Sequence, residues 1–277
     1  MIKKCLFPVA GYGTRFLPAT KSMPKEMLPI VNKPLVQYGV EEAIEAGMLN
    51  CALVTGRGKR AIADHFDISY ELEHQIAGSA KERYLTGIRD VIERGVFTMV
   101  RQRAMLGLGH AILTGEPLIG DQPFGVVLSD DLCLNGSGPG VLAQMAALYE
   151  EFQCSIVAVQ EVPMADIDQY GVVAGTPERD GLTRVTEMVE KPPRDEAPSN
   201  LAVIGRYILT PDIFDIIRST PPGRNGEVQL TDALQVQASE GRVLAYRFQG
   251  QRFDCGSVPG FVAATQHVYE HYYGHDQ

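Results

Sequence analysis

The sequence has no long hydrophobic run. No apolar stretch in its 277 residues reaches the roughly 18–20 residues that a membrane-spanning helix needs. Lys3 and Lys4 precede only a short apolar run, which ends at Gly11 and Gly13. We interpret this start as a first strand rather than a signal peptide. We therefore expect a cytoplasmic protein without a membrane partner.

Cysteine is sparse, and its spacing suggests no pairing. The five cysteines are odd in number and scattered, and none lies in a C-x-x-C pair. This pattern disfavours a disulfide framework or a zinc site. Reduced, mostly buried thiols in the cytoplasm are the simplest interpretation. The positions are Cys5, Cys51, Cys133, Cys154 and Cys255.

Positive charge is also in deficit. The chain has 25 Lys and Arg against 34 Asp and Glu, a formal net charge of −9. This balance argues against a nucleic-acid surface. Polyanions can still bind where cations are concentrated locally and metal ions assist. Composition is otherwise that of a globular protein, with 45% hydrophobic and 21% charged residues.

Short apolar runs alternate with segments of helical spacing over the first part of the chain. This alternation predicts an α/β fold, a doubly wound and mostly parallel mixed sheet with helices on both faces. Ligands bind outside the carboxyl ends of the strands in such sheets. The expected strands are 5–10, 51–55, 97–101, 124–128 and 155–160, and the expected helices are 34–46, 62–75, 109–118 and 141–152.

The pattern changes after about residue 162. Further strands are expected at 171–174, 182–189, 201–209 and 243–248, followed by a closing helix at 258–271. There is no long linker, internal repeat or low-complexity tract, so we expect one domain over 1–277. It would comprise a first half over about 1–161, a second half over about 162–257 that continues the same sheet, and a C-terminal helix over about 258–277.

The first strand ends in Ala10-Gly11-Tyr12-Gly13-Thr14-Arg15. Glycines let the backbone approach a phosphate and turn N–H groups toward it, and Arg15 adds a forked cation. The segment is not a Walker A loop, and Phe16 replaces the third glycine of a dinucleotide fingerprint. The alternative is a tight strand-to-helix turn with a surface arginine.

Lys25 follows in Pro24-Lys25-Glu26-Met27-Leu28-Pro29. A lysine after proline is usually solvated, but two framing prolines suggest a rigid loop that holds the ammonium in place. A fixed lysine beside a phosphate loop can stabilise charge on a transferring phosphoryl group.

Carboxylates follow two strands. Asp130 and Asp131 come after the strand 124–128, and Asp254 precedes Gly256 and a helix. Carboxylates at strand ends are where Mg²⁺ would be held against a triphosphate. An Asp pair can also simply cap a turn, but two separated sites fit a metal clamp better than either alone.

Two other patterns have weaker interpretations. Gly56–Ala61 fits the G-x-G-x-x-A variant of the dinucleotide fingerprint and supports an NAD(P)-dependent oxidoreductase, an alternative we disfavour because such short matches are common. His267, His271 and His275 recur every four residues. They could bind a metal on one helix face, although a solvated terminal helix is the more typical interpretation.

The chain as a whole resembles the bacterial UTP–glucose-1-phosphate uridylyltransferases. The match starts in the glycine loop and the Lys25 loop and continues in order to the C-terminal part. Its further motifs are Arg101-Gln102, Gly107-Leu108-Gly109-His110-Ala111, Leu128-Ser129-Asp130-Asp131, Tyr170-Gly171-Val172, Val189-Glu190-Lys191-Pro192, Gly226–Asp232 and Phe253-Asp254-Cys255-Gly256-Ser257.

The resemblance implies a nucleotide-binding first half. Gln102 would pair with the uracil edge, helped by backbone groups at Ala10 and Gly107, and Glu26 would lie near the nucleotide. Phosphates would lie on the loop that contains Gly11, Gly13, Thr14 and Arg15, and Asp130 and Asp254 would hold Mg²⁺.

The second half would bind the sugar phosphate. Glu190 would accept hydrogen bonds from glucose hydroxyls, Lys191 would meet the phosphate, Gly171 would let the backbone touch the sugar, and Val203 would form a wall. No ligand role is assigned to Asp131. The implied substrates are UTP and glucose 1-phosphate, and the implied products are UDP-glucose and pyrophosphate.

In the implied reaction, the sugar phosphate attacks the α-phosphorus in line, and Arg15, Lys25, Asp130 and Lys191 act as catalytic residues with Mg²⁺. A thymidylyltransferase using dTTP and a non-catalytic nucleotide-sugar sensor are the alternatives. The resemblance also suggests a homo-oligomer, a dimer or tetramer.

Overall fold

The computed structural model describes residues 1–223 and 226–273, and nine of its strands form one mixed sheet. The expectation that the second half continues the sheet of the first is confirmed. The strands are β1 (Lys4–Pro8), β4 (Asn50–Thr55), β5 (Val96–Arg101), β6 (Phe124–Val127), β8 (Ser155–Glu161), β9 (Gly171–Arg179), β10 (Leu182–Glu190), β11 (Leu201–Leu209) and β12 (Val243–Arg247).

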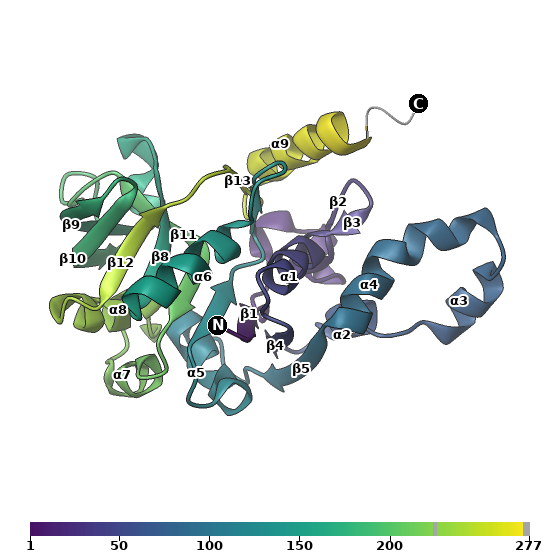
Figure 1. The fold of residues 1–277 in the computed structure, drawn as a ribbon, viewed down its shortest axis with the longest axis horizontal. Coiled ribbons are helices and arrows are strands. Elements are labelled where there is room, and N and C mark those ends of the chain that lie inside the picture. The colour runs from purple at the N-terminus through teal and green to yellow at the C-terminus, as the bar shows by residue number, and fades with distance from the viewer. Residues whose placement is uncertain (224–225, 274–277) are drawn as a thin grey trace.

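The strand order is β5-β4-β1-β6-β11-β8-β12-β10-β9 (Figure 1). Strands β5, β4, β1 and β6 run parallel, as do β8 and β12. Strand β11 runs antiparallel to its neighbours β6 and β8, and β9 and β10 form an antiparallel pair. The carboxyl ends of the parallel strands therefore open onto one edge of the sheet, where the predicted loops begin.

Helices cover both faces of the sheet. One face packs against α1 (Leu35–Glu45), α2 (Arg60–His65), α4 (Thr86–Arg94) and α6 (Val141–Phe152), and the other against α5 (Gly107–Ile119), α7 (Ile213–Ser219) and α8 (Leu230–Ser239). Strand β1 contributes side chains to the cores on both faces of the sheet, because Cys5 and Phe7 enter one core and Leu6 enters the other. The side chains of a strand alternate between faces, so its continuous apolar run is what a sheet covered on both sides requires.

The prediction of one helix over 62–75 is wrong. Helix α2 ends at His65, and a separate helix, α3 (Tyr70–Ile76), follows. Asp67 Oδ1 accepts a hydrogen bond from the Ile68 N–H at 2.8 Å. Such a local side-chain bond competes with the helical ladder and interrupts it. Figure 1 shows α3 lying away from the sheet, beyond α2 and α4.

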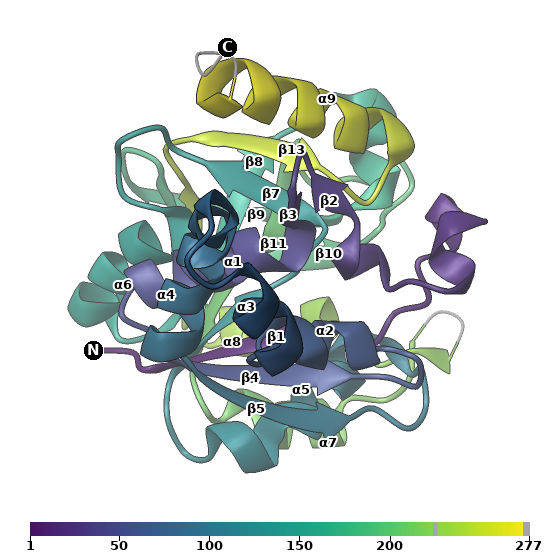
Figure 2. The same ribbon diagram turned by 90° about the vertical axis from the view of Figure 1, so that its right-hand side faces the viewer.

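The C-terminal part packs against segments from the middle and the start of the chain. Strand β13 (Gln251–Asp254) pairs antiparallel with β7 (Asp131–Leu134), and α9 (Val258–Val268) packs on β13 (Figure 2). The Ser257 hydroxyl caps α9 by accepting the Gly260 N–H at 3.2 Å. The ring of Phe261 on α9 meets that of Phe16 edge-on, with centroids 5.5 Å apart.

The last predicted helix is shorter than expected. A π-helical turn over Tyr269–Tyr273 replaces its end, and His275 lies outside the described residues. Within 1–223 and 226–273, no helix combines the length and the apolar character that crossing a bilayer requires.

Candidate active site

The glycine loop after β1 and the Lys25 turn pack against each other. Gly13 adopts a φ of 67°, and its carbonyl accepts the Thr20 hydroxyl at 2.7 Å. A Cβ on Gly13 would lie 2.9 Å from the Cβ of Lys25. Glycine is therefore required here both for its left-handed backbone and to let the lysine stem pass. Arg15 follows in the exposed turn η1 (Thr14–Phe16).

Lys25 and Asp130 form a close ion pair. Lys25 belongs to the turn η3 (Lys25–Met27), and its Nζ lies 2.5 Å from Asp130 Oδ2. Burial works to lower the pKa of Lys25, but the charges of Asp130 and Glu26 outweigh it and the pKa is raised. Burial also opposes ionisation of Asp130, yet the charge and hydrogen bond of Lys25 lower the pKa of that carboxyl. Both groups are therefore charged near neutral pH.

Asp254 and Asp130 converge although they are far apart in the sequence. A Cβ on Gly256 would lie 3.0 Å from Asp254 Oδ1, 3.3 Å from Asp130 Oδ2 and 3.4 Å from Arg15 Nη1. Two carboxylate oxygens and one guanidinium nitrogen thus surround a single point. In the part of the chain that the structure describes, no three His, Cys, Asp or Glu side chains are grouped to hold a metal. A pair of carboxylates fits Mg²⁺, which takes its other ligands from substrate phosphates and water.

Asp131 serves a structural ion pair. Its Oδ1 accepts from Arg252 Nε at 2.5 Å, and its Oδ2 accepts the Gly205 N–H at 3.0 Å. Arg252 also lies over the ring of Tyr170, 5.2 Å from its centroid. Both Asp131 oxygens are thus engaged within the protein, which agrees with giving Asp131 no ligand role.

A cavity of about 300 Å³ lies beside the glycine loop. Its lining brings together Ala10, Gln102 and Gly107, the residues predicted to meet the base, with Gly11 of the predicted phosphate loop. The Gln102 side-chain amide donates to the Gly107 carbonyl at 3.3 Å. Gly107 has a φ of 94°, and a Cβ there would lie 2.8 Å from the Val228 carbonyl. We call this space the Gln102 cavity.

His110 orients Gln102, a role that the sequence did not suggest. Its Nδ1 lies 2.9 Å from Gln102 Nε2. Because the amide nitrogen is held by Gly107 and His110, the side chain has one fixed orientation in the cavity wall. The glycine motif Gly107-Leu108-Gly109-His110 contained the only signal for it.

A second cavity, of about 290 Å³, brings together the residues predicted for sugar binding. Its walls include Gly171, Glu190, Lys191 and Val203. Lys191 has a φ of 46°, and its Nζ lies 3.4 Å from Glu190 Oε1. A non-glycine residue rarely adopts this backbone conformation. We call this space the Glu190 cavity.

Thr231 orients Glu190 from helix α8. Its hydroxyl donates to Glu190 Oε2 at 2.7 Å. A Cβ on Gly171 would lie 3.2 Å from both that oxygen and the Thr231 hydroxyl. Glycine at 171 therefore leaves the carboxylate undisturbed. Thr231 lies in the motif Gly226–Asp232, but nothing in that pattern indicated that its hydroxyl would meet Glu190.

The cavities adjoin one another. Glu227 lines the Gln102 cavity, the Glu190 cavity and a third space of about 630 Å³ that Arg15 and Lys191 also line. Together they form a cleft along the carboxyl edge of the sheet, with the Gln102 cavity and the Glu190 cavity joined through Glu227.

Glu26 lies outside these cavities. Its side chain is buried, and Lys59 Nζ lies 2.7 Å from its Oε2. A direct contact of Glu26 with the nucleotide stays a prediction. Lys59, the central cation of the Gly56–Ala61 motif, is turned inward and is not available for a dinucleotide phosphate.

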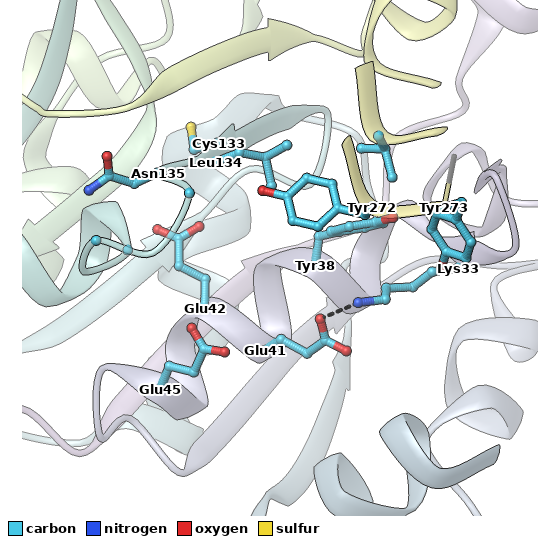
Figure 3. Close-up of a pocket in the computed structure, with 14 residues that line it drawn as sticks. Lys33, Tyr38, Glu41, Glu42, Glu45, Cys133, Leu134, Asn135, Tyr272 and Tyr273 are labelled. Carbon is cyan, nitrogen blue, oxygen red and sulfur yellow. Dashed lines mark hydrogen bonds and ion pairs between the residues drawn. The ribbon is translucent and has the colours of Figure 1, made fainter. Parts of the chain in front are cut away.

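A separate cavity of about 510 Å³ lies beside α1, away from the cleft (Figure 3). Figure 3 shows Glu41, Glu42 and Glu45 along α1 on one side and Tyr272 and Tyr273 on the other. Lys33 spans part of it, with its Nζ 2.7 Å from Glu41. It shares no lining residue with the three spaces of the cleft.

Almost the whole chain matches a known protein family. The sequence pattern of the family described as "Nucleotidyl transferase" matches residues 8–271. The UTP–glucose-1-phosphate uridylyltransferase of Pseudomonas aeruginosa strain PAO1 is 66% identical over 273 residues, which cover 99% of this chain and 98% of that protein.

Two solved structures share the whole fold. An apo UDP-glucose pyrophosphorylase superposes with a TM-score of 0.95 at 59% identity, covering 98% of this chain and 99% of that chain. A UDP-glucose pyrophosphorylase in complex with UDP-glucose superposes with a TM-score of 0.91 at 57% identity, with the same coverage. The chain belongs to the nucleotidyl transferase family, among the UTP–glucose-1-phosphate uridylyltransferases.

Proposed function

We propose that this protein transfers the uridylyl group of UTP to glucose 1-phosphate, forming UDP-glucose and releasing pyrophosphate. The observation that carries the proposal is the continuous cleft in which the Gln102 cavity, the Glu190 cavity and the cations Arg15 and Lys191 adjoin. The high identity to the uridylyltransferase of P. aeruginosa over almost the whole chain supports the same reaction.

The reaction needs no protein nucleophile, because glucose 1-phosphate brings its own. A phosphate oxygen of the sugar forms a bond to the α-phosphorus of UTP, and the bond between that phosphorus and the oxygen bridging to the β-phosphate breaks. Pyrophosphate leaves with this oxygen. The protein aligns two polyanions and offsets their charge, and Arg15, Lys25 and Lys191 supply the cations for this.

Mg²⁺ is the proposed cofactor, with Asp130 and Asp254 as its protein ligands. The convergence of their oxygens near Gly256 supports this assignment. When bound, the ion would neutralise phosphate charge and polarise the reacting phosphorus. The ammonium of Lys25 pairs with Asp130, and we propose that it meets the reacting phosphates beside this ligand.

Specificity would come from the two ends of the cleft. The fixed amide of Gln102 reads the imide edge of uracil, and Glu190, held by Thr231, accepts hydrogen bonds from the sugar hydroxyls. Thymine differs from uracil by a methyl group, which an apolar pocket rejects only weakly. Some turnover of dTTP is therefore expected.

The proposed function also assigns a role to each half of the chain. The first half, about 1–161, would bind the nucleotide, and the second, about 162–257, the sugar. We propose a homo-oligomer in which the C-terminal helix takes part, because Val258, Val262 and Tyr272 are about half exposed there. Five free cysteines, mostly buried, favour the reducing cytoplasm.

Pyrophosphate release tests the proposal. Protein, Mg²⁺ and glucose 1-phosphate are mixed in turn with UTP, dTTP, CTP, ATP and GTP. Release with UTP well above the others supports the assignment. Preference for dTTP would overturn the assignment of the base, and no release with any nucleotide would favour a non-catalytic sensor.

A further inference from the structure

Lys59 is a buried lysine at the start of α2. Its side chain is 7% exposed, whereas lysines are almost always solvated unless paired. Its backbone N–H donates to the Gly56 carbonyl at 3.4 Å, and its own carbonyl accepts the Ile62 N–H at 3.1 Å. Ile62 is fully buried in the core. The backbone of Lys59 is therefore held in place by hydrogen bonds on both sides.

The ammonium of Lys59 neutralises the carboxylate of Glu26. Nζ and Oε2 are 2.7 Å apart, and the Glu26 side chain is 2% exposed. The other oxygen, Oε1, is buried and has no hydrogen-bond partner among the described residues. Burial raises the pKa of Glu26, and the charges of Lys59 and Lys25 oppose that effect. The ionised state of Glu26 thus depends on Lys59.

Glu26 is joined directly to Lys25 in a short turn. The Met27 N–H donates to the Pro24 carbonyl at 3.0 Å, and the Leu28 N–H donates to the Lys25 carbonyl at 3.1 Å. Pro24 and Pro29 frame this turn and restrict its backbone further. Neighbouring residues in a turn held in this way have little freedom to move independently, so we expect a shift of Glu26 to displace Lys25 as well.

The segment from Gly56 to Lys59 also packs against the glycine loop after β1. A Cβ on Gly56 would lie 3.0 Å from the Ala10 carbonyl oxygen, and α2 packs on η3. The segment from Gly56 to Lys59 thus contacts both elements that are proposed to meet the nucleotide. These contacts give the motif Gly56–Ala61 a structural role that does not involve a dinucleotide.

We infer that Lys59 is a positioning residue for the transfer step: it holds the Glu26 carboxylate and, through the η3 turn, keeps the Lys25 ammonium on Asp130 and the reacting phosphates. The inference rests on the proposed function. Lys59 lines none of the three spaces of the cleft. Its loss should therefore lower kcat and leave the KM values for both substrates nearly unchanged.

The test compares Lys59→Met, Lys59→Arg and the double variant Glu26→Gln/Lys59→Met. Lys59→Met leaves a buried carboxylate without its cation, so the double variant is included to remove both charges and preserve the fold. Arg60→Met is the matched control, because Arg60 is the next residue and its side chain is 90% exposed. Each protein is assayed for kcat and both KM values at a temperature where circular dichroism shows it fully folded.

We expect Lys59→Met and the double variant to lose about 10²-fold in kcat, the cost of a small misplacement of a catalytic group. Lys59→Arg should recover most of that loss, and Arg60→Met should match the unmodified protein. If fully folded Lys59→Met and the double variant both keep normal kcat, or if KM rises while kcat holds, the inference is wrong. Absence of activity in the unmodified protein would instead refute the proposed function.

Discussion

Arg206 and Glu42 form an ion pair that is buried between β11 and α1. Two nitrogens of the guanidinium, Nε and Nη2, donate to Glu42 Oε2 at 3.0 and 2.8 Å, and the two side chains are only 1% and 8% exposed. The other Glu42 oxygen accepts the Leu142 N–H at 3.0 Å, at the start of α6. One carboxylate therefore ties the inserted strand β11 to two helices of the same face.

Breaking this pair should destabilise the protein. Glu42→Leu leaves a buried guanidinium without its counter-charge, which costs about 3–5 kcal/mol. The double variant Glu42→Leu/Arg206→Met should recover much of this loss, because no buried charge remains. Urea unfolding measures both, with Glu41→Leu as the control, since its partner Lys33 is partly exposed and such pairs contribute about 0–1 kcal/mol. A double variant no more stable than Glu42→Leu would contradict the argument.

Lys25→Ala should lower turnover by about 10²–10³-fold, as removal of one group that stabilises transition-state charge does. The affinity for UTP should stay within several-fold, because the base and the other cations still bind. Pyrophosphate release and equilibrium UTP binding measure the two effects. Lys21→Ala, an exposed neighbour, serves as the control. Near-normal turnover of Lys25→Ala would eliminate the role given to Lys25.

Asp254→Asn should weaken Mg²⁺ binding at the cleft. Loss of one of two carboxylates is expected to raise the Mg²⁺ concentration for half-maximal activity by about tenfold or more. A Mg²⁺ titration of activity, and of binding by calorimetry in the presence of UTP, measures the shift. Asp121→Asn, at an exposed position, should behave like the unmodified protein. An unchanged titration would remove Asp254 from the metal site.

Gly171→Ala should impair recognition of the sugar. The added methyl would lie 3.2 Å from Glu190 Oε2 and from the Thr231 hydroxyl, so the carboxylate must shift. A lost hydrogen bond to a charged group is worth about 1.5–3 kcal/mol, so KM for glucose 1-phosphate should rise by about 10- to 100-fold. KM for UTP should not change. Equal increases for both substrates would indicate a general distortion instead.

His65 should make stability sensitive to mild acid. Burial lowers the pKa of His65 from its ordinary value of 6.5, and its Nε2 lies 2.9 Å from Gln37 Oε1. Because the folded-state pKa is below the unfolded one, the contribution is present above pH 6.5 and is lost as pH falls through the folded-state value. Unfolding of the unmodified protein and of His65→Phe between pH 8 and 5 should show this extra loss only with histidine present. Parallel pH profiles would contradict it.

The sequence predicted the elements that local pattern encodes. Strands such as β4 and β11 and helices such as α1 and α6 were found nearly to the residue, because apolar runs and helical spacing report burial directly. The glycine loop and the Lys25 turn were also recognisable, since glycine and proline constrain the backbone wherever they occur. The missed break after His65 coincides with a side-chain bond from Asp67 to the Ile68 N–H. Such a bond competes with helix formation, and spacing does not reveal it.

The tertiary structure alone decided which side chains meet. Four pairs of site residues come from different parts of the chain. They are Asp130 with Asp254, His110 with Gln102, Thr231 with Glu190, and Lys59 with Glu26. Their contacts depend on strand order and on the pairing of β13 with β7. These features arise from packing between segments distant in the chain, where many mutually supportive long-range contacts select one arrangement, and no local sequence period records that choice.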